Sequence, residues 1–268
     1  MRIGITAVSL IATVFLAFSA GCSLETTSAP IPEPTLADDV ITASQSPDGA
    51  LEAVWTKNHE VLLVDPNGSV LQKIGVHGAA PIFSHDGRFV AYEKLADGSA
   101  DGAEQSLFEF ALGIAVHDLQ TGREYLVTNG GSDDFAPVGF SRDLSMLYFN
   151  STRPYDDSSG NRVASLWVVN LKTGETKRLT NVDEEAVRNG RMIPTISPTT
   201  ALWSSDRVTV FTSYGHETGV WKFALTDSSA SATRIAEGDA PQWVVPDKSI
   251  SVRTLVDGKD VRHTINVR

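Results

Sequence analysis

The chain has 268 residues, of which 41% are hydrophobic and 21% are charged, and its formal net charge is −11. This length and apolar content allow a sizeable folded core. An excess of acidic groups repels phosphate backbones and anionic lipid headgroups, so nucleic acid is not an expected partner. Cys22 is the one cysteine in the sequence, so the chain cannot form an internal disulfide.

The N-terminal segment has the features of an export signal. Arg2 precedes an apolar run over residues 3–18, and small residues follow that run up to Cys22. This setting resembles the lipobox of bacterial lipoproteins, although Ser19 stands where leucine is most usual. The resemblance implies a signal peptide over residues 1–21 and a mature chain whose first residue, Cys22, carries acyl chains such as palmitate. An uncut transmembrane anchor and an ordinary signal with a chance cysteine are the alternatives, and the apolar run is short for a membrane-spanning helix.

The segment after the cysteine is expected to be a tether. Residues 22–37 contain mostly Thr, Ser, Pro, Ala and Glu, which bury too little apolar surface to offset the entropy lost on ordering. Pro30, Pro32 and Pro34 favour an extended spacer. The globular domain should therefore span residues 38–268. Since Ser23 does not resemble an inner-membrane retention residue, the outer membrane is expected in a two-membrane cell.

Internal repetition indicates the architecture of this domain. A turn with an aspartate, followed by a β-branched or aromatic strand, recurs along the chain. The aspartates are Asp48, Asp86, Asp143, Asp206 and Asp247. Their spacing suits units of about 40 residues with insertions in two of them. We expect each aspartate to accept backbone hydrogen bonds within its own turn, which is a structural role. Five tryptophans are expected to fill space between the units, namely Trp55, Trp167, Trp203, Trp221 and Trp243.

Each unit continues with a hairpin. Residues 165–171 and 176–180 read as strands joined by a turn that contains Thr173-Gly174, and residues 114–119 and 124–128 repeat this pattern around Thr121-Gly122. The glycine permits the positive φ that a tight hairpin needs. Because the domain shows no sustained helical periodicity, we predict an all-β fold.

These motifs resemble the repeat of the TolB-type (PD40/WD40-like) β-propellers. The likeness includes Leu166-Trp167-Val168-Val169-Asn170, the Thr-Gly turn and the closing Arg178-Leu179-Thr180. It implies a single β-propeller of about five four-stranded blades, following the signal peptide and tether. A sixth, degenerate blade within residues 181–200 is the alternative. The last unit supplies about three strands, so residues 38–42 are expected to complete its sheet.

Motifs for catalysis and metal binding are weak. The sequence lacks a Gly-x-Ser-x-Gly elbow and a His-Glu-x-x-His motif, and its histidines lack metal-ligand spacing. His216 lies in a predicted loop. Asp156, Asp157 and Asn161 offer oxygen ligands without a calcium-loop register, and residues 183–185 read as a solvated acidic loop. We therefore expect no cofactor and no metal, and the pattern favours a non-enzyme without settling the point.

The expected function is that of a lipid-anchored module that binds an envelope protein or peptide. Its membrane contact would come from the acyl chains on Cys22. Its location would be the cell envelope, on the periplasmic side or the outer face of the cytoplasmic membrane, or at the outer membrane. The alternatives are a polysaccharide- or glycan-acting propeller enzyme and a propeller that assists a hydrolase. Insertions at residues 95–110 and 182–200 are where a specific role is expected.

Overall fold

The computed structural model describes most of the predicted globular domain. The described residues are 36–96, 111–153, 164–180, 195–198, 200–214, 219–226 and 229–267. They all belong to one compact unit, Pro34–Arg268, whereas the other unit, Met1–Glu33, lies outside the described residues. No helix among the described residues has the length and apolar character needed to cross a membrane.

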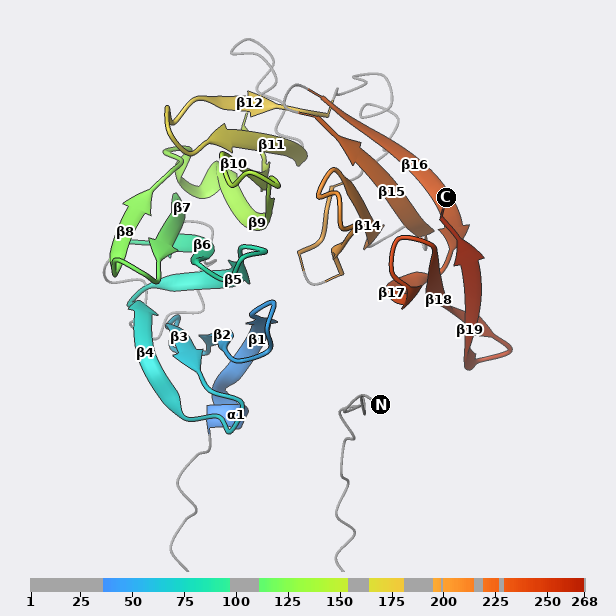
Figure 1. The fold of residues 1–268 in the computed structure, drawn as a ribbon, viewed down its shortest axis with the longest axis horizontal. Helices are drawn as coiled ribbons and strands as arrows, with labels where there is room; N and C mark the ends of the chain where they lie inside the picture. Colours follow the sequence, from blue (N-terminus) through green and yellow to red (C-terminus); the bar gives the residue numbers. More distant parts are fainter. Residues whose placement is uncertain are drawn as a thin grey trace, which may run out of the picture. The chain divides into compact units, whose positions relative to one another are not determined.

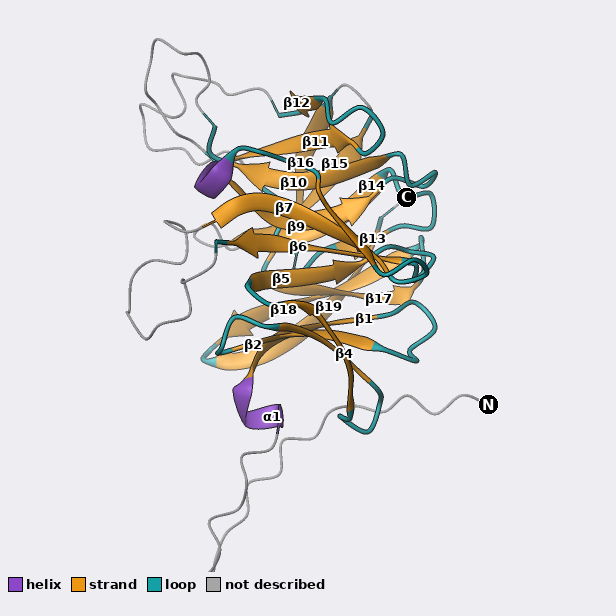
Figure 2. Cartoon of the chain, turned by 90° about the vertical axis from the view of Figure 1, so that its left-hand side faces the viewer, coloured by secondary structure: helices purple, strands orange, loops and turns teal. Residues whose placement is uncertain are grey.

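The described structure consists almost entirely of strands (Figure 2). Its helical segments are the single turn α1 (Leu36–Asp39) and the 3-10 turn η2 (Gly131–Asp133). The first sheet contains β1 (Val40–Gln45), β2 (Glu52–Thr56), β3 (Val61–Val64) and β4 (Val70–Gly75). The second contains β5 (Gly78–Phe83), β6 (Phe89–Leu95), β7 (Ala111–Asp118) and β8 (Arg123–Leu126).

Three further sheets follow in chain order. The third contains β9 (Asp134–Phe140), β10 (Met146–Ser151), β11 (Ser165–Asn170) and β12 (Thr176–Arg178). The fourth contains β13 (Leu202–Trp203), β14 (Thr209–Tyr214), β15 (Gly219–Leu225) and β16 (Ala230–Glu237). The fifth contains β17 (Asp239–Val245), β18 (Ser249–Val256) and β19 (Lys259–Asn266). All neighbouring strands pair antiparallel in sequence order, which confirms the prediction of an all-β fold with five repeated units.

One element differs from the prediction. Residues 38–42 were expected to complete the last sheet, but Val40–Gln45 forms β1 and pairs with β2 in the first sheet. The fifth sheet therefore has three strands among the described residues. The local sequence explains the pairing, because the Ser46–Gly49 turn connects β1 directly to β2 and brings them together as a hairpin. Most of residues 181–200, the alternative sixth blade, lies outside the described residues.

The core consists of apolar layers between consecutive sheets. Alternation along each strand sends one set of side chains to each face of the sheet. Tyr92 of the second sheet packs with Leu63 of the first, and Phe149 of the third packs with Val116 of the second. Phe223 joins the third sheet to the fourth, and Ile250 joins the fourth to the fifth. Figure 1 shows the sheets following one another in this order, with β1, β5, β9 and β17 as their inner strands.

A bulge recurs in the first strands, and the sequence analysis missed it. Ala80, Ala136 and Ala240 each precede a proline, and their φ angles are 48°, 46° and 45°. The strand register shifts beside all three residues. An alanine in this left-handed region is strained, and a bulge bends the strand locally. At the second bulge the N–H of Ala136 donates to Glu93 Oε1 of the second sheet at 2.6 Å, so the bend joins two sheets.

The turn glycines give a direct test of the hairpin geometry. Gly87 has a φ of 77°, and a Cβ placed there would meet only Pro47 Cδ at 3.6 Å, an ordinary contact. Because the penalty is conformational, Gly87→Ala should lower the free energy of unfolding by about 1–2 kcal/mol, as measured by urea titration. Gly87→Asn is the matched control and should cost less, since asparagine tolerates this region better. An alanine variant as stable as the parent would contradict this account.

Candidate functional site

The repeat aspartates organise the turns between the first and second strands. In four sheets a serine hydroxyl two residues earlier donates to the aspartate, and the aspartate accepts a backbone N–H two residues later. The serines are Ser46, Ser84, Ser141 and Ser204, and their partners are Asp48, Asp86, Asp143 and Asp206. These bonds lower the pKa of Asp48, chiefly through the Ala50 N–H, and that of Asp143 to about 2, chiefly through the Ser141 hydroxyl. The carboxylates are thus satisfied within the turns.

The fifth aspartate departs from the expectation that each acts in its own turn. Asp247 Oδ1 accepts the N–H of Ser205, at 2.9 Å, in the corresponding turn of the fourth sheet. The physical reason is that Val245 replaces the turn serine, so the carboxylate has no hydroxyl donor at the usual position. Asp247 therefore connects two sheets.

Tryptophans link the later sheets in a related way. The indole N–H of Trp203 donates to the carbonyl of Val138 in the third sheet, and that of Trp243 donates to the carbonyl of Trp203, both at 3.3 Å. Trp167 instead donates to Ser165 Oγ within its own strand and lies beneath the Arg153 guanidinium. Trp55 and Trp221 have buried indole nitrogens without a partner among the described residues.

The histidines do not converge on one site in the described part of the chain. His59 and His77 interact near the connection between the first two sheets, His85 lies in an aspartate turn, His117 lies on β7 and His263 on β19. Among the described residues, no group of three or more His, Cys, Asp or Glu side chains has a metal-binding arrangement. The remaining sequence candidates fall outside the described residues. They are Cys22, Asp156, Asp157, Asn161, Asp183, Glu184, Glu185 and His216.

His117 is a buried titratable group that the sequence did not single out. It is 6% exposed, and it faces the first sheet together with Val90 and Tyr92. Neither ring nitrogen has a hydrogen-bond partner in the described structure. Desolvation lowers its pKa, although the charges of Glu124 and Asp118 oppose this shift. The neutral imidazole is therefore the form that suits this interface.

This burial predicts a pH dependence of stability. Because the folded-state pKa is lowered, the stability is fully present above the ordinary value of about 6.5 and is lost as the pH falls below it. His117→Leu should therefore show a smaller loss of unfolding free energy between about pH 7 and 5 than the parent, each pH unit being worth at most about 1.4 kcal/mol. The exposed His263→Leu variant controls for the loss of one imidazole. Equal slopes for His117→Leu and the parent would rule out this role.

The strand ends define two different surfaces. The aspartate turns and the Thr-Gly hairpins lie at one end of the sheets, where all connections are short. The β6–β7 and β10–β11 connections leave from the opposite end, and residues 97–110 and 154–163 of these connections lie outside the described structure. Among the described residues, a candidate site can therefore be formed only by strands and short turns.

An apolar groove lies at the short-turn end, between the second and third sheets. Its volume is about 380 Å³, and its lining residues are Phe89, Val116, Tyr125, Leu126, Val127, Leu144, Asn170, Leu171 and Gly174. Tyr125 and Leu126, on the outer strand β8, are 49% and 52% exposed. At its edge Arg88 forms an ion pair with Asp118 at 2.7 Å, and the guanidinium lies 4.7 Å from the Phe89 ring centroid. The groove can hold an apolar side chain of a partner.

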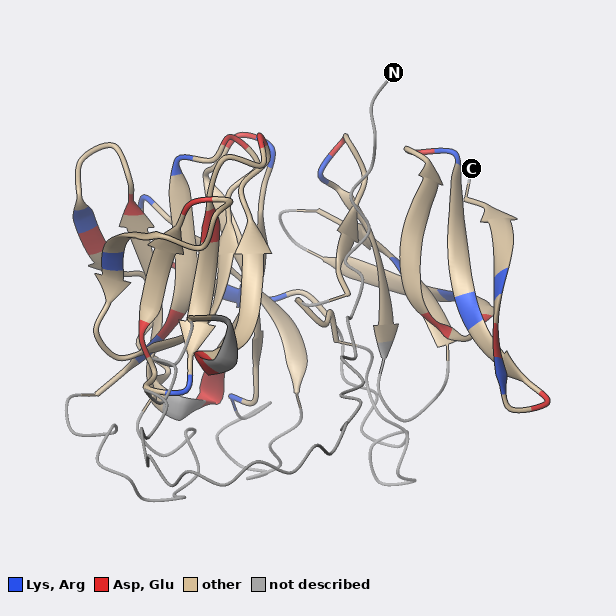
Figure 3. Ribbon diagram, turned by 90° about the horizontal axis from the view of Figure 1, so that it is seen from below, with Lys and Arg blue, Asp and Glu red and all other residues tan. Residues whose placement is uncertain are grey.

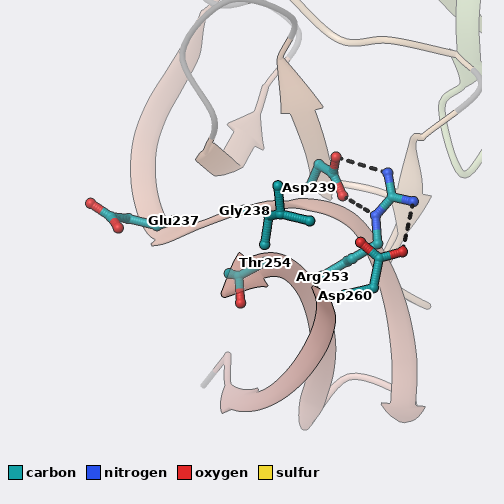
Figure 4. A pocket seen from close by; sticks show the side chains of 7 residues that line it. Glu237, Gly238, Asp239, Arg253, Thr254 and Asp260 are labelled. Carbon is teal, nitrogen blue, oxygen red and sulfur yellow. Dashed lines mark hydrogen bonds and ion pairs between the residues drawn. The ribbon is translucent and has the colours of Figure 1, made fainter. Parts of the chain in front are cut away.

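A polar cleft lies at the opposite end of the fifth sheet (Figure 4). Its volume is about 490 Å³, and Glu237, Gly238, Asp239, Arg253, Thr254, Leu255 and Asp260 line it. Arg253 Nε and Nη2 donate to the two oxygens of Asp239 at 2.7 and 2.9 Å, and Asp260 approaches Nη1 at 3.8 Å. These contacts lower the pKa of Asp239, chiefly through the Arg253 hydrogen bond. The arginine is already neutralised, so the cleft lacks a free cation to capture an anion.

Comparison with solved structures shows that the fold is a β-propeller similar to that of TolB. TolB from Acinetobacter baumannii matches with a TM-score of 0.54 at 16% identity, over 85% of this chain and 52% of that protein. The crystal structure of the tricorn protease matches with a TM-score of 0.51 at 17% identity, over 85% of this chain and 25% of that one. At such identities the likeness concerns the fold, and it confirms the predicted propeller.

Sequence comparison adds one relative. The tricorn protease of Thermoplasma volcanium is 26% identical over 159 residues, which cover 55% of this chain and 15% of that protein. This chain thus spans about half of the Acinetobacter baumannii TolB and a small part of the tricorn protease. A scan against models of protein families finds no match.

Proposed function

We propose that this chain is an acylated cell-envelope protein whose propeller binds a protein or peptide partner without catalysing a reaction. The groove between the second and third sheets is the observation that carries this proposal. Its walls are apolar, and Tyr125 and Leu126 expose about half of their surface beside it. Contiguous exposed apolar surface marks interaction sites, and tyrosine is enriched at protein interfaces.

The groove is held by rigid elements. Val116 belongs to the buried layer between the second and third sheets, and Phe89, Leu144 and Leu171 pack against that layer. The Arg88 and Asp118 ion pair fixes the turn beside Phe89. A partner side chain would therefore enter a preformed site, which limits the entropy lost on binding.

The sequence around Cys22 supports the envelope location. A lipid on this residue would hold the propeller at a membrane through the tether of residues 22–37. The mature chain, with 21 basic and 33 acidic residues, gains no attraction to anionic headgroups, so acylation would supply the attachment. The likeness to TolB supports a role in the envelope by analogy of fold alone.

The groove variants test the binding role. Tyr125→Ser with Leu126→Asp should abolish capture of a partner from envelope extracts and weaken binding to the purified partner by about tenfold or more in calorimetry. Val70→Asp with Leu71→Ser is the matched control, because these β4 residues are 52% and 57% exposed and do not line the groove. Unchanged binding in the groove variant, or equal loss in both, would refute the groove as the site.

Mass spectrometry and fractionation test the anchor. The membrane-bound protein should begin at Cys22 and carry the added mass of acyl chains. Cys22→Ser should leave the signal peptide uncut or release the protein from the membrane fraction, because the thiol is the acceptor of the lipid. Finding an intact N-terminal Met1 with an unmodified cysteine would contradict the anchor, whatever the groove binds.

A second candidate is a propeller that works with a separate hydrolase. The sequence match to the tricorn protease favours it. The partner captured by the wild-type chain separates the two possibilities. A peptidase whose substrate preference changes when the propeller is added would support the second candidate, and a partner without hydrolase activity would support the first.

A further inference from the structure

The fifth sheet has an outer edge unlike those of the other four. In each of those sheets a fourth strand covers the third, and β3 is buried along its whole length. β19 occupies the third-strand position of the fifth sheet, and it pairs only with β18 among the described strands (Figure 1). None of its residues is buried, although Val261 and Ile265 are apolar.

The edge of β19 is regular. It pairs with β18 over eight consecutive residue pairs, from Val256–Lys259 to Ser249–Asn266, without a register shift. Bulges and prolines, which commonly protect an edge from further pairing, are absent from this strand. Its outer row of backbone groups can therefore accept another strand.

Charges on the solvent side of this sheet specify the strand that fits. Asp239, Arg253 and Arg262 follow one another across the three strands, because Arg253 pairs with Asp239 on one side and with Arg262 on the other. Two arginines opposite each other repel. Asp239 accepts hydrogen bonds from Nε and Nη2 of Arg253, and Asp260 lies 3.8 Å from Nη1. Arg262 feels the charge of Asp239, but its hydrogen bonds within the described structure go to the Ala240 carbonyl and Ser251 Oγ, at 3.3 and 3.2 Å.

The next strand should therefore place an acid opposite Arg262. It should also place a base opposite Asp260, which lies on the same face of β19 and whose existing contact with Arg253 is long, at 3.8 Å. Figure 3 shows both signs of charge on this sheet, at the C-terminal end of the chain. β19 itself supplies the required pattern in the order Asp260-Val261-Arg262. An antiparallel copy reverses the order, so that each Asp260 faces an Arg262 of the other chain.

We propose that β19 pairs with β19 of a second copy of this chain, antiparallel and centred on Val261, to form a twofold dimer. The two Val261 side chains lie opposite each other, with one Asp260–Arg262 pair on either side. Beyond this segment each strand passes the β18–β19 hairpin of its partner, where Leu255 and Val256 are 72% and 46% exposed. Such an interface uses the same patch on both chains, as a twofold dimer requires.

Analytical ultracentrifugation of residues 22–268 with Cys22→Ser tests the dimer. We expect reversible dimers whose dissociation constant rises with salt, since exposed charge pairs are screened. Arg262→Asp and Asp260→Arg should each weaken the dimer by about tenfold or more, because each places like charges opposite each other. The double variant Asp260→Arg with Arg262→Asp restores the pairs in reversed order and should dimerise like the parent.

Mixing the two single variants gives the decisive measurement. One variant carries two acidic residues at these positions and the other carries two basic residues, so the mixture should form a heterodimer that neither variant forms with itself. Circular dichroism and the unfolding midpoint establish that each variant is folded, since both positions are exposed.

Three results would overturn the proposal: a monomer at all concentrations, a dimer indifferent to both single variants, or a mixture that does not associate. If this edge instead bound a strand from a different protein, the purified chain would be a monomer at all concentrations, which is the first of these results. The groove variants leave β19 unchanged, so failure of the dimer and failure of the proposed binding role are separate outcomes.

Discussion

Face-to-face packing of consecutive sheets is the interaction on which this fold depends. A single four-stranded sheet with apolar residues on both faces cannot exclude water from either of them alone. Phe149 and Val116, or Phe223 and Val210, become buried only because a neighbouring sheet covers them. The burial of each such side chain contributes about 1.5–3 kcal/mol, which is large compared with any single surface contact. The sheets therefore stabilise one another as a series.

Polar contacts set the geometry of this series without supplying most of its stability. Serine–aspartate hydrogen bonds hold the turn between the first and second strands in four sheets. The indole groups of Trp203 and Trp243 connect successive inner strands. Arg153 makes a related contact by donating to Asp134, which is fully buried at the start of β9. The serine–aspartate bonds make the short-turn end rigid, whereas the Arg153–Asp134 contact lies at the opposite end of the third sheet. A rigid end is a suitable frame for a preformed apolar groove.

Features formed by residues close together in the sequence were predictable, whereas features that bring together residues from separate sheets were not. Ser46 and Asp48 lie two residues apart, so their turn could be recognised directly, and the Thr-Gly hairpins were equally local. The alanine bulges carried a signal, a recurring Ala-Pro pair, but a residue before proline ordinarily favours extended backbone. The groove draws Phe89, Tyr125 and Leu171 from separate hairpins, and only the packing of the second sheet on the third brings them together. The interaction of Asp247 with Ser205 depends on the placement of two sheets in the same way.

The first and fifth sheets each have one face outside the four apolar layers between consecutive sheets. The face of the first sheet that does not contact the second contains Val54, Leu62 and Val64, and Leu36 and Val40 from its own N-terminal segment cover it. The corresponding face of the fifth sheet carries Ser251 and Arg253, together with Leu255, which is 72% exposed. The first of these faces is covered by its own chain, and the second is mainly polar. The backbone edge of β19 is one place in the described structure where β-pairing can continue, and its alternating charges restrict which strand can do so.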